Sequence, residues 1–337
     1  MLNKIKSKRI VLKYMKHHPE NVALTVIRNN NVIVSFNSNR MMPLASVVKI
    51  MIAIEYAQQS ANGRINPDEP VNLTEIDKYY IPKLDGDAQL KWIDSLKSLN
   101  LIKDNSVSLK EVAKGMIDFS SNANADYLIE ILGIDNINKN ISTLGLKNHD
   151  KIFPFSFFLM PYGLMQKNDN LPEKERIAKT KEELRNMTKE QFYLLAMQEH
   201  NKLANDIDGA YKKAVDIEKW YDNEFDKINS DRMVASTAED YGLLLSKING
   251  RNYFSPQVQN YLDQLMEGLM ESAGNQELFQ HLGFKGGSTN YILNTALYAI
   301  DKKDDSTEIV LFINNIEQKD YEKLQGNMNE FLYGILD

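Results

Sequence analysis

The stretch Pro43-Leu44-Ala45-Ser46-Val47-Val48-Lys49-Ile50-Met51-Ile52-Ala53 decides how the rest of this chain is interpreted. It predicts an apolar helix that begins near Ser46 and continues to about Ser60. Residues i and i+3 lie on one face of a helix, so the Ser46 hydroxyl and the Lys49 amine could share a proton. Desolvation by apolar neighbours favours the neutral amine, which can accept that proton. Ser46 is therefore a candidate nucleophile, and Lys49 is its candidate base.

The same two residues also have a purely structural interpretation. Serine is a common helix cap, and a lysine can extend its stem over apolar neighbours while its amine stays in water. A serine and a lysine three residues apart occur by chance in many chains. The choice between the two interpretations therefore depends on motifs further along the chain.

Composition excludes several classes of protein. The 337 residues are 43% hydrophobic and 26% charged, which suits one large domain or two closely associated ones. A net charge of −6 without an extended basic stripe argues against nucleic acid as a partner. No cysteine is present, so disulfides and thiolate metal sites are excluded. No apolar stretch approaches the roughly 18 residues of a membrane span.

The N-terminal segment bears on the compartment. Its apolar residues form too short a run, interrupted by lysines, for the core of a signal peptide. As it stands, the sequence indicates a cytoplasmic protein, and an extracellular one if a leader has been removed.

Strand patterns occur near both ends of the chain, and helical patterns fill the middle. Residues 22–27 and 32–36 are rich in β-branched side chains. They predict a hairpin around Asn29-Asn30-Asn31, because asparagine tolerates a left-handed backbone. Further strands are expected at 283–288, 291–300 and 308–313, with a closing helix over 321–336. One sheet should therefore be assembled from both ends of the chain.

This pattern predicts two structural parts. Residues 1–44 and 236–337 should form the sheet part, and residues 45–235 a helical part. Charged and amide residues dominate 172–229, with apolar residues at helical intervals. We expect an inserted group of two or three surface helices there. Its charge indicates a solvated face, and a partner-binding role is the alternative.

Two more motifs occur after Ser46-x-x-Lys49. Ser120-Ser121-Asn122 lies between two predicted helices, and Lys285-Gly286-Gly287-Ser288 lies in a predicted strand. This order resembles the penicillin-recognising serine hydrolases, which include class A β-lactamases and penicillin-binding proteins, with their S-x-x-K, S-D-N and K-T-G motifs. The resemblance covers most of the chain outside 172–229. It implies an α+β fold of the β-lactamase/transpeptidase type, with an antiparallel sheet flanked by helices beside an all-helical lobe.

The resemblance also implies catalytic roles. Ser46 would attack a carbonyl and form an acyl-enzyme, and Lys49 would take its proton. Ser120 would relay a proton towards the leaving nitrogen. The charge of Lys285 would favour that relay and attract an anionic substrate.

Five residues would bind the substrate according to the same resemblance: Asn122, Tyr80, Gly287, Ser288 and Thr289. Asn122 would hold the side-chain amide of the substrate and contact Lys49. Tyr80, in Tyr-Ile-Pro, would line the mouth of the cleft, although an ordinary packed tyrosine is the alternative. The backbone N–H groups of Ser46 and Ser288 would form the oxyanion hole. A glycine such as Gly287 lets the backbone approach a substrate along the strand edge.

Two departures from the motifs concern single residues. Ser121 stands where aspartate is usual, at a position expected to face inward with a structural role. Gly286 stands where a threonine or serine usually binds the substrate carboxylate. Either Ser288 or Thr289 would have to supply that hydroxyl, and otherwise affinity for β-lactams should be poor.

The third departure concerns the deacylating base. Class A enzymes carry a glutamate some three dozen residues after the second motif. The corresponding residues here, 153–161, contain no carboxylate and predict a buried loop or short strand. Glu182 and Glu183, within the charged insertion, are weak alternatives. Without a base, the protein would acylate and then stall.

The sequence thus predicts a serine hydrolase that acts on a small, anionic substrate such as a β-lactam. A D-amino-acid peptidase or small-molecule esterase is the alternative within the enzymes, and a binding member of the fold without turnover is the alternative outside them. No metal or organic cofactor is implied, since the five histidines form no pair at ligand spacing. The sequence does not indicate an oligomeric state.

Overall fold

The computed structural model describes residues 2–336, which form two compact units. The first contains the chain up to Val48, Ile141–Asp150, and the chain from Arg232 onward. The second contains Lys49–Asn140 and Lys151–Asp231. The boundaries that the sequence suggests, after residues 44 and 235, differ from these by a few residues and leave 141–150 in the helical part.

The first unit contains a five-stranded antiparallel sheet in the order β2-β1-β9-β8-β7. Its strands are β1 (Val22–Arg28), β2 (Asn31–Phe36), β7 (Phe279–Ser288), β8 (Leu293–Asp301) and β9 (Ser306–Ile313). The predicted hairpin turn is confirmed, with φ of 50° at Asn29 and 62° at Asn30. Strands from both ends of the chain therefore build one sheet, as the sequence predicted.

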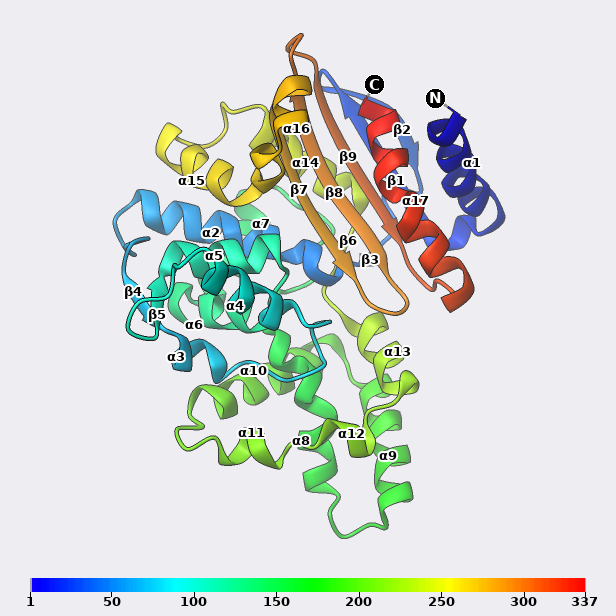
Figure 1. Cartoon of the computed structure of the whole chain (residues 1–337). Helices are drawn as coiled ribbons and strands as arrows, with labels where there is room; N and C mark the ends of the chain where they lie inside the picture. Colours follow the sequence, from blue (N-terminus) through cyan, green and yellow to red (C-terminus); the bar gives the residue numbers. More distant parts are fainter. Residues whose placement is uncertain (1, 337) are drawn as a thin grey trace. The chain divides into compact units, whose positions relative to one another are not determined.

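Helices cover both faces of this sheet. Alternate residues of a strand point to opposite faces, and β9 is buried on both. Ile309 and Leu311 belong to the core shared with α1 (Leu2–His17) and α17 (Gln318–Leu336), which lie side by side in Figure 1. On the other face, the Phe312 ring lies 5.8 Å from that of Tyr241, on α14 (Ala238–Asn249).

Short elements complete the first unit. They are η1 (Pro19–Asn21), β3 (Met42–Pro43), η2 (Ala45–Val48), β6 (Ala235–Ser236), α15 (Pro256–Met266), η4 (Gly268–Glu271) and α16 (Ala273–Leu278). Strands β3 and β6 pair with each other. The 3-10 turn η2, which contains Ser46, packs against the edge strand β7.

The second unit is built around α2 (Lys49–Ala61), which packs against α5 and α6 and is buried along most of its length. Its other elements up to residue 167 are β4 (Pro70–Asn72), α3 (Leu73–Asp77), α4 (Ala88–Ser98), β5 (Ser106–Ser108), α5 (Leu109–Asp118), α6 (Asn122–Leu132), α7 (Ile134–Thr143), η3 (Phe155–Leu159) and α8 (Met160–Lys167). Strands β4 and β5 form a small antiparallel ladder, so the expected all-helical lobe is not purely helical.

The charged insertion contains five helices rather than two or three. They are α9 (Glu173–Asn186), α10 (Lys189–Ala204), α11 (Ala210–Ala214), α12 (Ile217–Trp220) and α13 (Asn223–Arg232). The prediction of surface helices is wrong for α10, which packs against η3. Its Phe192 is buried, with its ring 6.0 Å from that of Phe157. The apolar positions of the insertion thus support the preceding buried segment.

No helix within residues 2–336 is both long and apolar enough to cross a membrane. Over the same residues, no three or more histidine, aspartate or glutamate side chains are grouped so that they could hold a metal ion.

Candidate active site

Ser46 lies in the turn η2 and not on the helix that the sequence predicted. The regular helix α2 begins at Lys49, three residues later. The residue before the serine, Ala45, has a left-handed backbone with φ of 47°. That conformation costs an L-residue about 1 kcal/mol or more. The candidate nucleophile therefore follows a strained position, and such strain is characteristic of functional sites.

Lys49, the lysine of the first motif, is hydrogen-bonded to the second motif, and both lie in the second unit. Its side chain is buried, and Nζ donates hydrogen bonds to the backbone oxygen of Ser120 at 2.6 Å and to Oδ1 of Asn122 at 2.7 Å. Ser120 also has a left-handed backbone, with φ of 65°. The expected contact between Asn122 and the lysine is therefore present in the structure.

Ser121 has the inward orientation that the sequence predicted. Its side chain is fully buried, and its hydroxyl caps α6 by accepting a hydrogen bond from the N–H of Asn124 at 3.1 Å. The hydroxyl also donates to Oε1 of Gln89 at 2.5 Å. A hydroxyl can thus satisfy the buried surroundings of this position without the usual aspartate.

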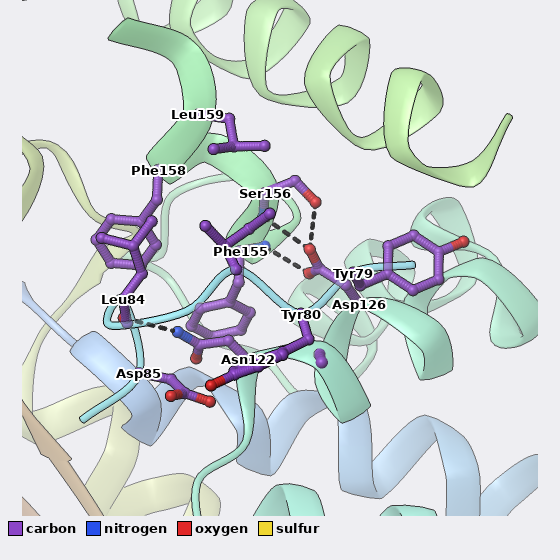
Figure 2. Close-up of a pocket in the computed structure, with 12 residues that line it drawn as sticks. Tyr79, Tyr80, Leu84, Asp85, Asn122, Asp126, Phe155, Ser156, Phe158 and Leu159 are labelled. Atoms are coloured by element: carbon purple, nitrogen blue, oxygen red, sulfur yellow. Dashed lines mark hydrogen bonds between the residues drawn. The ribbon is translucent and has the colours of Figure 1, made fainter. Parts of the chain in front are cut away.

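The segment around Phe155, beyond the second motif, presents an aromatic ring to Lys49. The centroid of the Phe155 ring lies 4.3 Å from Nζ. Asp126, almost fully buried on α6, accepts hydrogen bonds from the backbone N–H groups of Phe155 at 2.6 Å and Ser156 at 2.7 Å, and from the Ser156 hydroxyl (Figure 2). One buried carboxylate therefore fixes the backbone that carries the ring.

Asp126 and Phe155 were not predicted as site residues from the sequence. A signal was nevertheless present, because Asp126 follows Asn122 by four residues and thus shares its face of α6. The aromatic ring had no such signal, since its contact with Lys49 joins segments about a hundred residues apart.

The two glutamates proposed as weak alternatives for the base lie on α9. Glu182 is exposed, and Glu183 accepts a long hydrogen bond from Nδ2 of Asn168 at 3.5 Å. Neither glutamate is among the residues that line the pocket next to Asn122.

Asn122 opens onto a pocket that is open to solvent (Figure 2). Its walls are Tyr79, Tyr80, Ile81, Leu84, Asp85, Asn122, Ala123, Asp126, Phe155, Ser156, Phe158 and Leu159. Tyr80 therefore lines a cavity together with Asn122. Burial raises the pKa of the Tyr80 hydroxyl, and the carboxylate of Asp85 adds to this effect.

The third motif lies at the end of β7, in the first unit. Lys285 is almost fully buried, and Nζ donates to the backbone oxygen of Gly286 at 3.0 Å. Ser288 is exposed where β7 ends. The Thr289 hydroxyl accepts a hydrogen bond from the N–H of Tyr291 at 3.1 Å. A side-chain hydroxyl is therefore available on the surface next to Gly287.

Gly287 brings β7 into close contact with the turn that contains Ser46. A Cβ atom at this position would lie 2.6 Å from the backbone oxygen of Leu44 and 2.9 Å from the nitrogens of Ser46 and Val47. Real Cβ atoms essentially never approach other atoms so closely. Glycine is thus required here, and the backbone of β7 lies directly against the N–H of the candidate nucleophile.

The chain is similar to beta-lactamases along most of its length. A sequence model of the beta-lactamase enzyme family matches residues 6–273. A class A beta-lactamase from Bacteroides cellulosilyticus DSM 14838 is 17% identical, with a TM-score of 0.56 and 98% of each chain covered. A beta-lactamase from Chitinophaga pinensis DSM 2588 is 14% identical, with a TM-score of 0.57 over 100% of both chains. None of the curated proteins matches the chain.

A third similar structure is that of a mutant of PBP-A, solved as an acyl-enzyme complex with penicillin G. It is 14% identical, with a TM-score of 0.54 over 98% of this chain and 96% of that one. At these identities the similarities establish the fold alone. The predicted β-lactamase/transpeptidase-like fold is therefore confirmed.

Proposed function

Because this chain belongs to the beta-lactamase enzyme family, we propose that it is a serine hydrolase that forms an acyl-enzyme on Ser46 with a β-lactam or a related small amide. The observation that supports this most directly is the arrangement around Lys49. Its amine is buried and hydrogen-bonded to both Ser120 and Asn122. A structural lysine that only extends over apolar neighbours would place its amine in water.

The proposed acylation uses three side chains in sequence. The Ser46 hydroxyl oxygen attacks the substrate carbonyl carbon while Nζ of Lys49 takes the hydroxyl proton. The backbone N–H groups of Ser46 and Ser288 stabilise the oxyanion. The carbon–nitrogen bond of the substrate then breaks. The Ser120 hydroxyl donates its proton to the leaving nitrogen and regains one from Lys49, which returns to the neutral amine. The product of these steps is an ester on Ser46.

The charge of Lys285 provides a second element of the proposal. A buried ammonium group next to a strand edge favours a substrate that carries a carboxylate. Gly286 contributes no hydroxyl to this interaction, so Ser288 is the side chain that would supply it.

The ring of Phe155 supports slow deacylation. Hydrolysis of the ester needs a group that removes a proton from water. A phenyl ring lies against Lys49 and cannot accept a proton. We therefore expect a long-lived acyl-enzyme, as in a penicillin-binding protein, rather than rapid turnover.

A peptidase or esterase acting on a D-amino-acid derivative or small ester is the second candidate. The missing hydroxyl at Gly286 favours it, because a substrate without a carboxylate loses nothing there. A binding member of the fold without turnover would instead not react at Ser46.

Intact-protein mass spectrometry after incubation with penicillin G tests the proposal. We expect wild type to gain the mass of one penicillin and Ser46→Ala to gain none. Ser98→Ala, which removes an exposed hydroxyl on α4, is the matched control and should behave as wild type. Drug consumption without an adduct would indicate rapid turnover and would contradict slow deacylation.

If wild type neither binds nor consumes penicillin G, the β-lactam proposal is wrong. Hydrolysis of a chromogenic ester that is lost in Ser46→Ala would then favour the esterase. No reaction with either substrate would favour the binding protein.

A further inference from the structure

The pocket next to Asn122 contains a carboxylate oxygen that no protein group satisfies. Oδ1 of Asp85 is buried and has no hydrogen-bond partner, whereas Oδ2 accepts the N–H of Gln89 at 3.0 Å. A buried acceptor without a partner costs free energy, and a native structure keeps one mainly where something else supplies the donor. The carboxylate therefore has the free capacity to bind a ligand.

Apart from Asp85, the carboxylate and amide side chains of the pocket and the Ser156 hydroxyl are already hydrogen-bonded. The Asp126 carboxylate holds the backbone of Phe155 and Ser156, and the Ser156 hydroxyl donates to it. Asn122 accepts from Lys49 and donates to the backbone oxygen of Leu84 at 3.5 Å. Among the buried polar side-chain atoms that line the pocket, Asp85 Oδ1 alone is left unsatisfied in the described structure.

The remaining walls are apolar and largely aromatic. Figure 2 shows the rings of Tyr80 and Phe155 and the carboxylate of Asp85 near the Asn122 amide, and all four residues line the pocket. Leu84, Phe158 and Leu159 also line the pocket. Such walls favour a ring or a branched apolar group, and aromatic faces also attract a cation.

The charges near Asp85 are compatible with a cationic ligand group. Burial raises the pKa of Asp85, while the hydrogen bond from Gln89 and the charge of Lys49 oppose this, and Asp87 adds a further negative charge. A ligand ammonium next to Oδ1 would favour the ionised carboxylate, so binding and ionisation would reinforce each other.

We propose that this pocket receives the acyl side chain of the substrate, and that Asp85 selects side chains in which an aromatic or branched apolar body bears a primary ammonium group. This inference rests on the proposed function only in assuming that the bound group belongs to an acylating substrate. The preferred substrate then carries an ammonium group for Asp85. An arylglycyl amide has this chemistry.

The test compares ampicillin with penicillin G, which differ only by an amino group on the carbon next to the phenyl ring. We expect ampicillin to acylate wild type about 10-fold faster, the range for a hydrogen bond to a charged group. Asp85→Asn should remove this difference, because its amide keeps an acceptor for Gln89 but loses the charge.

Asp87→Asn is the matched control. It removes the same charge two residues away, from an exposed side chain that does not line the pocket. We expect it to keep the preference for ampicillin. If Asp85→Asn slows acylation by both penicillins equally, Asp85 acts in the acylation reaction and does not select the side chain. That result would overturn the proposal.

A second measurement does not depend on acylation. Ligand-observed NMR should show that D-phenylglycinamide binds wild type about 10-fold more tightly than phenylacetamide, with the difference lost in Asp85→Asn. If neither penicillin acylates the protein, the proposed function fails while this comparison still decides the role of Asp85. Equal binding of the two fragments to wild type would refute the selection.

Discussion

The aromatic ring of Phe155 lies over the side-chain nitrogen of Lys49, with 4.3 Å between Nζ and the ring centroid. The face of an aromatic ring attracts the side-chain nitrogen of a lysine. It offers no atom that can hold a proton taken from water. The pair therefore suits a site that forms an ester more readily than it hydrolyses one.

Replacing this ring by a carboxylate should restore hydrolysis. We expect Phe155→Glu to shorten the lifetime of the penicillin G adduct by about 100-fold, the lower range for general-base catalysis. Phe155→Gln has nearly the same shape without a base and should leave the adduct long-lived. Time-resolved mass spectrometry after removal of free drug measures both lifetimes. Equal lifetimes in the two variants would show that the ring does not limit deacylation.

The contact between Gly287 and the turn around Ser46 predicts a large effect of a single methyl group. Gly287→Ala must displace the backbone at Leu44, Ser46 or Val47, since its Cβ would lie 2.6–2.9 Å from them. We expect acylation to slow by about 100-fold or more, as when an oxyanion-hole donor is lost. The measurement is the rate of adduct formation with penicillin G.

Gly286→Ala provides the control for that prediction. Its Cβ would approach no atom closer than 3.3 Å, and the nearest atoms belong to the movable side chain of Phe284. We expect acylation within a few-fold of wild type. An equal loss of acylation rate in both variants would mean that acylation is sensitive to any substitution in this part of β7, and not specifically to the close contact at Gly287.

The carboxylate of Asp126 should be essential for the stability of the second unit. Asp126→Asn replaces one of the acceptors for two backbone N–H groups and one hydroxyl with a donor. We expect this substitution to lower the free energy of unfolding, measured by urea denaturation, by about 2 kcal/mol. Ser156→Ala removes only the hydroxyl and should cost about half as much. An unchanged free energy of unfolding in Asp126→Asn would show that hydrogen bonds to water replace those to the carboxylate.

His200 makes part of this stability dependent on pH. Burial lowers its pKa, but hydrogen bonds and charge interactions with Asp126 and Glu130 outweigh this, so the pKa in the folded protein lies above the ordinary 6.5. Its contribution is therefore complete below about pH 6.5 and is lost as the pH rises through the folded-state pKa. Urea midpoints of wild type should exceed those of His200→Gln most at pH 5.5 and least at pH 8.5.

His149, in the first unit, is expected to show the opposite dependence. Burial lowers its pKa, so its contribution is present above the ordinary 6.5 and is lost as the pH falls. The difference between wild type and His149→Gln should therefore be smallest at pH 5.5. The same direction for both histidines would contradict the assignment of their surroundings.

The sheet could be predicted because its signals are local. Alternating and β-branched residues define a strand such as β9, and the asparagines at 29 and 30 supply the left-handed turn between β1 and β2. The order of three short motifs was enough to suggest the fold. It also predicted the contact between Lys49 and Asn122, which the structure contains.

Features that depend on contacts between distant segments could not be predicted. The ring of Phe155 faces Lys49 because Asp126 accepts the hydrogen bond of the Phe155 backbone N–H and α10 packs against η3. The spacing of apolar residues in α10 indicates a buried face but not what covers it. The turn at Ala45 was also missed, because alanine has no preference for a left-handed backbone and only the surrounding packing imposes it.

The backbone at Ala45 and Ser120 sets a limit on how the protein can adapt to heat. Both residues have a left-handed backbone, which glycine adopts without strain and which costs each of them about 1 kcal/mol or more. Selection for thermal resistance alone would favour glycine at both positions. It would then erase the serine of the second motif and loosen the turn before Ser46. Robustness and reactivity therefore compete at two defined positions, and gains in heat resistance that preserve reactivity must come from elsewhere in the chain.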